Sequence, residues 1–369
     1  MQINKLQLIN FRNYENLNID LAPGINLFIG PNAQGKTNVL EAIYLCATGR
    51  SFRTHKDQEM IKWDQSFFKI GVNFHRKPIN FHIDFLYDKK QKKIKINGLP
   101  QKKLSDLIGQ LQVVLFSPEH LQLIKGGPGE RRRFIDILLS QINPMYFHAL
   151  QQYYKVLNQR NNLLKTTNYL SSQLNSQLEV WDSQLVEWGS RIILKRFETV
   201  GKLEGLAQKY HQTITEGDEE FTLSYRCSIA QEERNKGHLT RQYSELLEQR
   251  RKVDVLKGYT SIGPHRDDLI FLVNQIDLKN FGSQGQQRTA VLALKMAEVD
   301  LIQLESGDAP ILLLDDVMSE LDDRRSKFLV QSIGTKIQTL ITATSVNSFL
   351  GYNYKLHRVL KGQVLDQEV

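Results

Sequence analysis

The sequence has 369 residues, of which 41% are hydrophobic and 24% charged, and its formal net charge at pH 7 is +8. This composition is typical of folded globular proteins, and a chain of this length usually forms two domains. No apolar run reaches the roughly 18 residues that a membrane-spanning helix needs, and the N-terminus lacks a signal-peptide core, so we expect no membrane association. Cys46 and Cys227 have no metal-ligand spacing, so we expect a reduced, cytoplasmic protein. The positive charge favours a polyanion such as nucleic acid, although many basic proteins bind none.

In chain order, the first segments predict strands at 3–11 and 19–29, joined by a turn at 13–16. Both strand segments alternate or run apolar, and the turn is rich in asparagine. Residues 67–97 alternate again and predict an antiparallel sheet of about three strands. The hairpin in this sheet is strongly basic and contains Lys89, Lys90, Lys92, Lys93 and Lys95.

A glycine-rich loop follows the apolar segment 25–29 and consists of Gly30, Pro31, Asn32, Ala33, Gln34, Gly35, Lys36 and Thr37. The apolar spacing after it predicts a helix that ends near Gly49 as its C-cap. Strand, loop and helix form the context in which backbone N–H groups surround a phosphate. We expect Lys36 to contact the β- and γ-phosphates of ATP and the Thr37 hydroxyl to ligate Mg²⁺. The alternative is a chance match in a glycine-containing turn, which the flanking elements disfavour.

The middle of the chain is predominantly helical in pattern. Helical spacing dominates 130–213, a short strand is expected at 221–227, and a helix follows at about 238–256. Because heptads are not sustained, we expect a compact lobe rather than a long coiled-coil arm. The predicted division has a head of residues 1–112 and 257–369 and an inserted, mainly helical lobe of residues 113–256.

Two adjacent carboxylates follow an apolar run at 311–314. Asp315 would lie at the tip of a buried strand and hold Mg²⁺ directly or through water. Asp316, one residue further, would orient or deprotonate the attacking water. The alternative is a pair of helix-capping residues, but capping alone does not explain four preceding aliphatic residues. We therefore favour a catalytic role for both.

A second glycine-containing stretch includes Ser283, Gly285 and Gln286 and precedes a clear helical pattern. Ser283 is expected near the N-cap, where it offers a hydroxyl and the positive end of the helix dipole. Without other information, an ordinary capped helix is the better interpretation of this stretch.

Taken together, these motifs resemble an ABC-type ATPase head. The resemblance rests on Gly30–Thr37, Ser283–Gln286, Asp315-Asp316 and Ser319–Asp322, in that order. In the family these correspond to the Walker A loop, the signature motif, Walker B and the D-loop, to which Asp322 belongs. The family's geometry implies that the signature motif of one subunit covers ATP held by the other, so that ATP joins two copies of the chain.

The sequence is more closely similar to the RecF branch of these ATPases, over its whole length. The matching blocks are Leu8–Tyr14, Gly30–Asn38, Gly49–Arg53, Phe116–Leu121, Gly126–Asp136, Gly263–Asp268, Gly285–Arg288 and Leu312–Val317. The resemblance implies an α/β fold: an ABC-type P-loop ATPase head with an antiparallel β subdomain and an inserted helical lobe. It implies a protein of DNA replication, recombinational repair and SOS induction. Such a protein binds single-stranded and linear double-stranded DNA, or their junctions, as an ATP-dependent homodimer. Partner mediators of the RecO/RecR type would load recombinase at gaps.

Two positions depart from the general ABC pattern. Thr344-Ser345 occupies the place of the switch histidine, and Gln112 is only a nearby candidate for the Q-loop glutamine. Both departures favour slow, DNA-stimulated hydrolysis that acts as a switch. An ABC-headed nuclease of the overcoming-lysogenisation type is the alternative, but too few residues follow Asp322 for its nuclease domain. A transporter ATPase subunit would lack these blocks and the insert, and a small-molecule kinase needs no signature motif.

Candidate DNA contacts come from the basic groups. They are Lys89, Lys90, Lys92, Lys93, Lys95, Arg250, Arg251 and Lys252. Each group alone is more often a solvated surface than a binding site. Contacts to phosphate predict little sequence preference and a steep dependence on salt. Arg131–Arg133 is a third basic group and the least favoured for DNA, since it would instead pack between lobe and head. His265 has no second ligand nearby and is expected to give structural support to the signature region.

Overall fold

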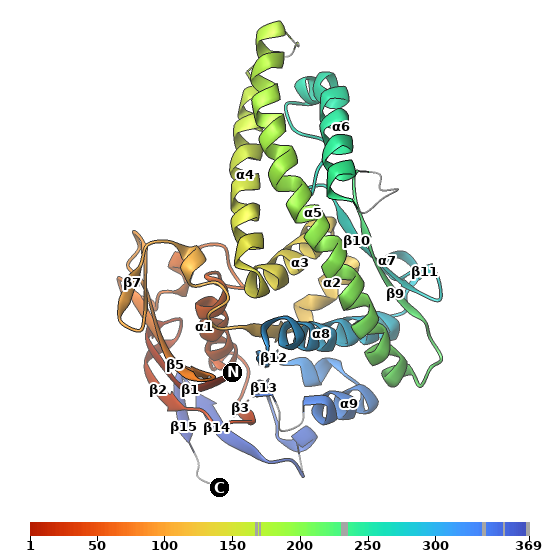
Figure 1. Ribbon diagram of the computed structural model, residues 1–369. Coiled ribbons are helices and arrows are strands. Elements are labelled where there is room, and N and C mark those ends of the chain that lie inside the picture. Colours follow the sequence, from red (N-terminus) through yellow and green to blue (C-terminus); the bar gives the residue numbers. More distant parts are fainter. Residues whose placement is uncertain (167–168, 170, 230–234, 334–336, 350, 367–369) are drawn as a thin grey trace. The chain divides into compact units, whose positions relative to one another are not determined.

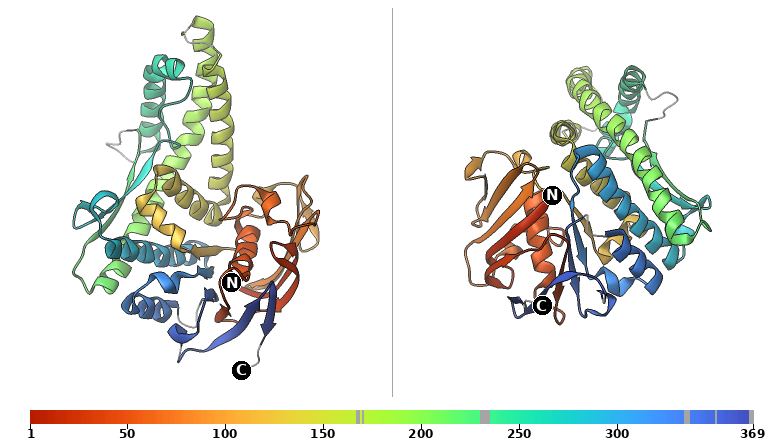
Figure 2. Two further views of the ribbon diagram at one scale, coloured as in Figure 1. Left: turned by 180° about the vertical axis from the view of Figure 1, so that it is seen from behind. Right: turned by 60° about the horizontal axis from the view of Figure 1, so that its bottom comes forward.

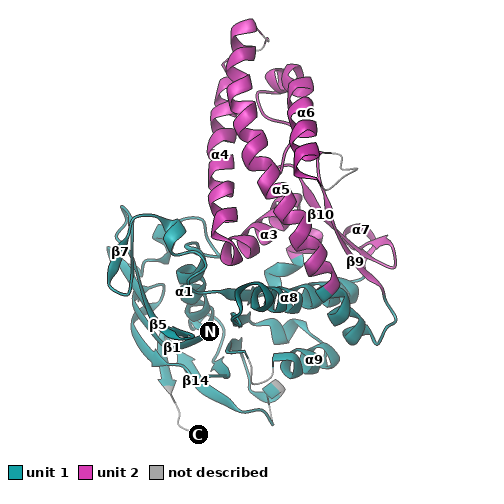
Figure 3. Cartoon of the chain, in the orientation of Figure 1, with its two compact units in different colours: residues 1–121, 206–219, 283–369 teal, residues 122–205, 220–282 magenta. Residues whose placement is uncertain are grey.

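The computed structural model describes residues 1–166, 169, 171–229, 235–333, 337–349 and 351–366. The chain forms two compact units, shown in different colours in Figure 3. Unit 1 consists of residues 1–121, 206–219 and 283–369, and unit 2 of residues 122–205 and 220–282.

The unit boundaries differ from the sequence-based division at three segments, the first of which, residues 113–121, belongs to unit 1. Residues 206–219 belong to unit 1, where Tyr210 donates a hydrogen bond of 2.7 Å to Asp300. Residues 257–282 belong to unit 2, because the strand at 268–273 pairs with the strand at 221–226. Sequence periodicity cannot reveal such long-range pairing.

Unit 1 contains an antiparallel sheet in the order β2-β1-β4-β5-β6-β7. Its strands are β1 (Gln2–Phe11), β2 (Tyr14–Asp20), β4 (Phe68–Arg76), β5 (Ile79–Tyr87), β6 (Lys92–Ile96) and β7 (Leu99–Gln101). The prediction of about three strands in 67–97 is confirmed. The turn predicted at 13–16 is wrong, because Phe11 pairs with Tyr14 and β2 already begins there. The strand predicted at 19–29 is in fact the end of β2 and a separate strand, divided at Pro23-Gly24.

The second sheet of unit 1 is mainly parallel, in the order β15-β14-β3-β13-β12-β8. Its strands are β3 (Ile25–Ile29), β8 (Val113–Phe116), β12 (Ile311–Asp315), β13 (Thr339–Ala343), β14 (Tyr354–Leu360) and the antiparallel β15 (Gln363–Asp366). β3 pairs on one side with β13 and on the other with β14. The carboxyl ends of β3 and β12 therefore lie at one edge of the sheet, followed by the glycine-rich loop and by Asp316.

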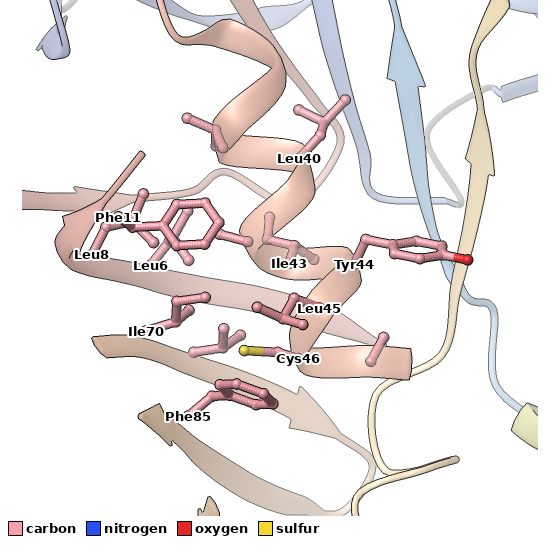
Figure 4. Close-up of a cluster of buried hydrophobic side chains, with 14 of the residues drawn as sticks. Leu6, Leu8, Phe11, Leu40, Ile43, Tyr44, Leu45, Cys46, Ile70 and Phe85 are labelled. Carbon is pink, nitrogen blue, oxygen red and sulfur yellow. The ribbon is translucent and has the colours of Figure 1, made fainter. Parts of the chain in front are cut away.

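Helix α1 (Lys36–Thr48) packs between these sheets. It is apolar around most of its circumference and contacts β1 and β4 as well as β8, β12 and β13. Figure 4 shows Leu40, Ile43 and Cys46 of α1 in the buried cluster with side chains of the antiparallel sheet. The helix ends at Gly49, as predicted, in a left-handed conformation with φ 71°. The core thus fixes the helix whose N-terminus carries the loop.

Two further helices of unit 1 are α8 (Gln284–Ser306) and α9 (Asp323–Ile333). α8 has fourteen buried positions and contacts β8. The short helix η4 (Val317–Glu320) directly follows the carboxylate pair at the end of β12.

Unit 2 is mainly helical. Its helices are α2 (Gln122–Lys125), α3 (Pro128–Ile142), α4 (Pro144–Leu164), α6 (Lys236–Lys257), α7 (Leu278–Phe281) and most of α5 (Ser172–Thr215), and its strands are β9 (Phe221–Arg226), β10 (Asp268–Val273) and β11 (Ile276–Asp277). The strand and helix predicted at 221–227 and 238–256 are confirmed as β9 and α6. α4, α5 and α6 run alongside one another in Figures 1 and 2. α5 has 44 residues, which is longer than we expected for a helix of a compact lobe.

Buried ion pairs join the helices of unit 2. Arg160 of α4 donates to Asp182 of α5 at 2.6 Å and to Asp254 of α6 at 2.8 Å. Arg196 is fully buried and donates to Asp136 at 2.7 Å and to the carbonyl of Pro264 at 2.7 Å. Removing one partner from such a pair is strongly destabilising, because the other charge stays buried. No helix in the described part of the chain is long and apolar enough to cross a membrane.

Candidate nucleotide-binding and signature sites

The glycine-rich loop spans residues 30–35, between the end of β3 and the start of α1. Pro31, Asn32 and Ala33 are exposed. Gly35 is the N-cap of α1 with φ 114°, and a Cβ there would lie 2.7 Å from the side-chain oxygen of Asn13. Only glycine fits this position, since both its backbone conformation and its surroundings exclude a side chain. The loop therefore presents its backbone at the positive end of α1, which suits a phosphate.

The loop is held in shape by residues far away in sequence. The Asn13 amide donates to the carbonyl of Gln34 at 2.7 Å, and the Tyr14 hydroxyl donates to the carbonyl of Gly35 at 3.1 Å. On the other side, the backbone N–H of Lys361 donates to the Gln34 side chain at 2.7 Å. The β1–β2 turn and the β14–β15 turn thus support the loop from two directions. Such support pre-organises a binding site before its ligand arrives.

Lys36 is buried at the start of α1 and donates to the carbonyls of Gly30 at 2.6 Å and Pro31 at 2.9 Å. Burial lowers the pKa of its ammonium, and the negative charges of Asp316 and Asp315 oppose this shift. Its hydrogen-bond partners are neutral carbonyls, so its charge is not cancelled by an ion pair.

Asp315 ends β12 and lies beside the start of α1. Its carboxylate accepts hydrogen bonds from the hydroxyl of Thr37 at 2.7 Å and from that of Thr342 on β13 at 2.8 Å. Burial raises the pKa of this carboxyl, and the two hydroxyl groups oppose the increase. The structure therefore brings Thr37 and Asp315 together, although they lie far apart in the sequence. Their hydroxyl and carboxylate oxygens suit Mg²⁺, which takes hard oxygen ligands.

Asp316 follows with φ 51°, a left-handed conformation that is rare for a residue with a side chain. Its backbone N–H donates to the hydroxyl of Thr342 at 2.9 Å. The hydroxyl of Thr342 thus fixes both carboxylate residues, since it donates to Asp315 and accepts from Asp316. A residue held in a sparsely populated conformation is frequently part of a functional site. The predicted switch-position residues Thr344 and Ser345 follow β13 and are both exposed.

Sequence reasoning missed a buried carboxylate behind the loop. Glu41 of α1 is fully buried and accepts from Arg12 at 2.5 Å and from the Ser51 hydroxyl at 2.5 Å. Arg53 lies 3.5 Å from the same carboxylate and donates to Asn38 at 2.8 Å. This network gives a structural reason for two of the matching blocks, Leu8–Tyr14 and Gly49–Arg53. The blocks themselves were the signal, but nothing in the sequence paired them with Glu41.

The second glycine-containing stretch starts α8, as predicted. Ser283 is the N-cap and forms a reciprocal capping box with Gln286, in which each side-chain oxygen accepts a hydrogen bond from the backbone N–H of the other residue. Gln286 also donates to Glu219 at 2.8 Å. The backbone of Gly285 is fixed by Arg325, whose guanidinium donates to the Gly285 carbonyl at 3.1 Å. No hydrogen bond among the described residues joins 283–286 to 30–37, so these segments do not contact each other through such bonds.

Asp322 caps α9, with its carboxylate accepting from the backbone N–H of Arg325 at 2.9 Å. The same carboxylate forms an ion pair with the Arg325 guanidinium. Asp322 is thus rigidly placed at the end of the segment that begins at Asp316.

The candidate DNA-contacting lysines lie on different sides of the hairpin. Lys93 and Lys95 alternate with buried Ile94 and are exposed on the outer face of the sheet. Lys92 points to the opposite face, where it pairs with Asp57 at 2.9 Å. Lys89 and Lys90 lie exposed in the turn.

The second basic group is also divided. Arg250 and Lys252 are exposed on α6. Arg251 is buried and donates to Asp182 at 2.8 Å, so it cannot contact DNA and we leave it out of the proposed set. Successive helical residues point in directions about 100° apart, so residue 251 can be buried while both of its neighbours are exposed. Arg131 is buried and pairs with Asp268 of the same unit at 2.6 Å. The ring of His265, expected to support the signature region, bonds instead within unit 2, to Tyr153 at 2.6 Å and to the carbonyl of Thr260 at 3.1 Å.

Comparison with known proteins agrees with this geometry. Residues 2–361 match the family model described as the RecF/RecN/SMC N terminal domain. The chain is 42% identical over 369 residues to the DNA replication and repair protein RecF of Staphylococcus carnosus, covering 99% of this chain and 100% of that protein. It is 45% identical to the RecF protein of Clostridium perfringens strain SM101, covering 99% of each.

Solved structures give the same result. A structure titled as the recombination mediator protein RecF-ATPrS in the RecFOR pathway is 35% identical, with a TM-score of 0.92, over 99% of this chain and 98% of that one. The SMC head bound to the winged-helix domain of ScpA has a TM-score of 0.57 at 14% identity, which shows a shared fold alone. The predicted ABC-type fold is confirmed. The chain belongs to the RecF family of DNA replication and repair proteins, whose fold is that of an ABC-type ATPase head.

Proposed function

We propose that this chain is a cytoplasmic, ATP-controlled DNA-binding protein that acts in recombinational repair, replication and SOS induction. Two copies bind ATP and Mg²⁺ between them, engage single- and double-stranded DNA or their junctions, and hydrolyse ATP slowly when DNA is bound. The closed dimer helps mediators of the RecO/RecR type load recombinase at gaps. The head contains the nucleotide site, and the helical lobe is inserted into it.

The observation that carries this proposal is the meeting of Thr37 and Asp315 beside the phosphate loop. Backbone N–H groups and Lys36 would bind the phosphates. The Thr37 and Asp315 oxygens would hold Mg²⁺, which neutralises the charge on the transferred phosphoryl group. Asp316 would accept a proton from the attacking water or orient it.

The trans arrangement rests on the signature stretch. Ser283 presents its hydroxyl and the start of α8, as an anion site does. No hydrogen bond among the described residues joins this stretch to the loop of the same chain. An ATP molecule in one subunit would thus be covered by Ser283, Gly285 and Gln286 of the other, and Asp322 would reach the same interface.

The proposal of DNA binding rests on exposed positive charge and on the similarity to a solved recombination mediator protein. Lys89, Lys90, Lys93 and Lys95 contribute one basic surface, and Arg250 and Lys252 a second. Contacts of this kind release counterions, so affinity should fall steeply with salt and show little sequence preference.

The decisive experiment measures sedimentation mass with and without a non-hydrolysable ATP analogue and a gapped DNA duplex. The proposal expects a monomer alone and a dimer with the analogue. Ser283→Arg should keep ATP binding but remain monomeric, because the new side chain fills the space that the partner's nucleotide needs. Ser176→Arg, an exposed position on α5, adds the same charge elsewhere and should dimerise normally. A Ser283→Arg protein that dimerises like the parent would refute the trans arrangement.

A further inference from the structure

Two arginines connect the start of α8 with the segment that runs from Asp316 to Asp322. Arg288 of α8 pairs with Glu320 at 2.6 Å. Arg325 of α9 donates to the hydroxyl of Thr289 at 2.9 Å and to the carbonyl of Gly285 at 3.1 Å, and it also pairs with Asp322. The two side chains reach in opposite directions across the same junction.

Arg325 is the centre of this junction because all three nitrogens of its guanidinium donate hydrogen bonds. Nε bonds to Thr289, one terminal nitrogen bonds to Gly285, and the other bonds to Asp322. A planar fork with several donors can hold three acceptors in fixed positions, which a lysine ammonium does less well. A Cβ on Gly285 would lie 3.3 Å from Arg325, so the glycine allows this close approach.

The segment on the other side of the junction leads directly to the carboxylates. Ser319 of η4 donates to the carbonyl of Asp316 at 2.7 Å, so η4 is bound back onto the residue that follows β12. Asp322 then caps α9 through the Arg325 backbone N–H. Hydrogen bonds and the intervening backbone therefore connect Asp316, through η4 and Asp322, with Arg325 and Gly285.

We propose that Arg325 is a positioning residue that fixes the signature stretch and Asp322 as one block, and so couples the two nucleotide sites of an ATP-bound dimer. The inference rests on the proposed function, in which Gly285 faces the partner's nucleotide while Asp316 faces the chain's own. Displacement at one site is then transmitted to the other through a single side chain. Arg325 itself touches neither nucleotide.

The test compares Arg325→Met, Arg325→Lys and the parent, with Arg324→Met as the matched control. Arg324 is the neighbouring residue on α9, and its exposed ion pair with Glu216 should contribute little. Three quantities are measured: ATP affinity at protein concentrations where no dimer forms, the dimer dissociation constant with a non-hydrolysable analogue, and the Hill coefficient of ATP hydrolysis.

Arg325→Met should bind ATP within about twofold of the parent. Its dimer dissociation constant should rise about tenfold, the typical effect of losing one charge-assisted hydrogen bond, and its Hill coefficient should fall to about 1. Arg325→Lys should recover part of both, since it keeps the charge but not the fork. Arg324→Met should match the parent.

Asp322→Asn provides a second, independent measurement, because asparagine still caps α9 but cannot form the ion pair. The effects of Asp322→Asn and Arg325→Met on the dimer constant should be clearly less than additive. If Arg325→Met does not fold, Arg325→Lys and Asp322→Asn decide the question in its place.

A folded Arg325→Met protein with the parent's dimer constant and Hill coefficient overturns this inference and leaves the proposed function intact. Equal weakening by Arg324→Met would also overturn it, since the effect would then be one of surface charge. A parent that remains monomeric with ATP overturns the proposed function and this inference together.

Discussion

Charged residues at the candidate nucleotide site of unit 1 are used in the opposite way from those in the buried ion pairs of unit 2. In unit 1, Lys36 bonds to two neutral carbonyls, and Asp315 bonds to two neutral hydroxyl groups. In unit 2, the charges of Arg160 and Arg196 are cancelled by their own aspartates. A charge that is satisfied by dipoles remains available to a ligand, whereas a charge that is paired inside the chain stabilises the fold. The residue type alone does not distinguish the two uses.

The largest effect is expected where an internal pair is broken. Arg196→Met leaves the Asp136 carboxylate buried without its cation, although it still accepts a hydrogen bond from the Tyr146 hydroxyl. The free energy of unfolding should fall by about 3–5 kcal/mol, measured by urea denaturation. Arg191→Met on the same helix removes an exposed pair with Glu187 and should cost at most about 0.5 kcal/mol. Similar losses for the two variants would remove the distinction between buried and exposed pairs.

Lys36→Ala should weaken ATP binding strongly, just as Arg196→Met should lower the stability of the fold. ATP affinity should fall at least about a hundredfold, because the charge-assisted bonds to phosphate are lost. Binding is measured by calorimetry. Lys56→Ala, which removes an exposed lysine paired with Glu59, is the control and should bind ATP normally. Tight ATP binding by Lys36→Ala would show that the loop is not the phosphate site.

A pH dependence should come from unit 2. Burial lowers the pKa of His265 to about 4, and the positive charges of Arg266, Arg132 and Arg160 contribute, while the bond to the Thr260 carbonyl opposes the shift. Below pH 6.5 the unfolded chain binds a proton that folded His265 does not, so stability is complete above pH 6.5 and is lost as the pH falls towards 4.

The loss from this one group should be on the order of 2 kcal/mol between pH 6.5 and 4. Urea denaturation at several pH values measures it. His265→Asn should be less stable at pH 7 but should lack this part of the pH dependence. An unchanged slope in His265→Asn would assign the pH dependence to other groups.

The smallest effect concerns exposed charges on the hairpin, of which Lys93 also forms an ion pair with Asp88 at 3.0 Å. Replacing Lys93 and Lys95 together by glutamate should weaken DNA binding about tenfold and reduce the salt slope by about 2. Fluorescence anisotropy at several salt concentrations measures both. Lys92→Glu is a poor substitute, because Lys92 supports the inner face through Asp57. The same test with Arg250 and Lys252 shows whether unit 2 shares the contact. Normal binding by the Lys93 and Lys95 variant would leave that hairpin as a solvated surface.

Local patterns in the sequence predicted the parts of the fold that depend on local chemistry. The glycine-rich loop, the α1 C-cap at Gly49 and the Ser283 N-cap are set by residues within a few positions of each other. The turn of the β1–β2 hairpin was predicted too late in the chain, because its two residues lie within a polar stretch and Arg12 has a left-handed φ of 55°. Only its pairing with β1 makes Tyr14 the first residue of a strand.

In the candidate site, as in the fold, the local motifs were predictable and the long-range contacts were not. Each motif was visible, but the partners that hold it were not, because Asn13 and Lys361 reach Gln34 across distant segments. The buried pairing of Arg251 with Asp182 was equally hidden, since a run of basic residues carries no mark of which one turns inward. Long-range pairing of this kind is decided by packing and is not encoded in any one segment.

The position of β3 between β13 and β14 has a consequence for the order in which the protein can form during synthesis. β3 and the glycine-rich loop emerge early from the ribosome, but the two strands that flank β3 and the turn that supports Gln34 are made near the end of the chain. The apolar strand Ile25–Ile29 therefore waits unpaired while most of the protein is translated. Exposed strand edges of this kind are prone to aggregation. The nucleotide site can therefore be completed only after β13, β14 and the turn at Lys361 have been made.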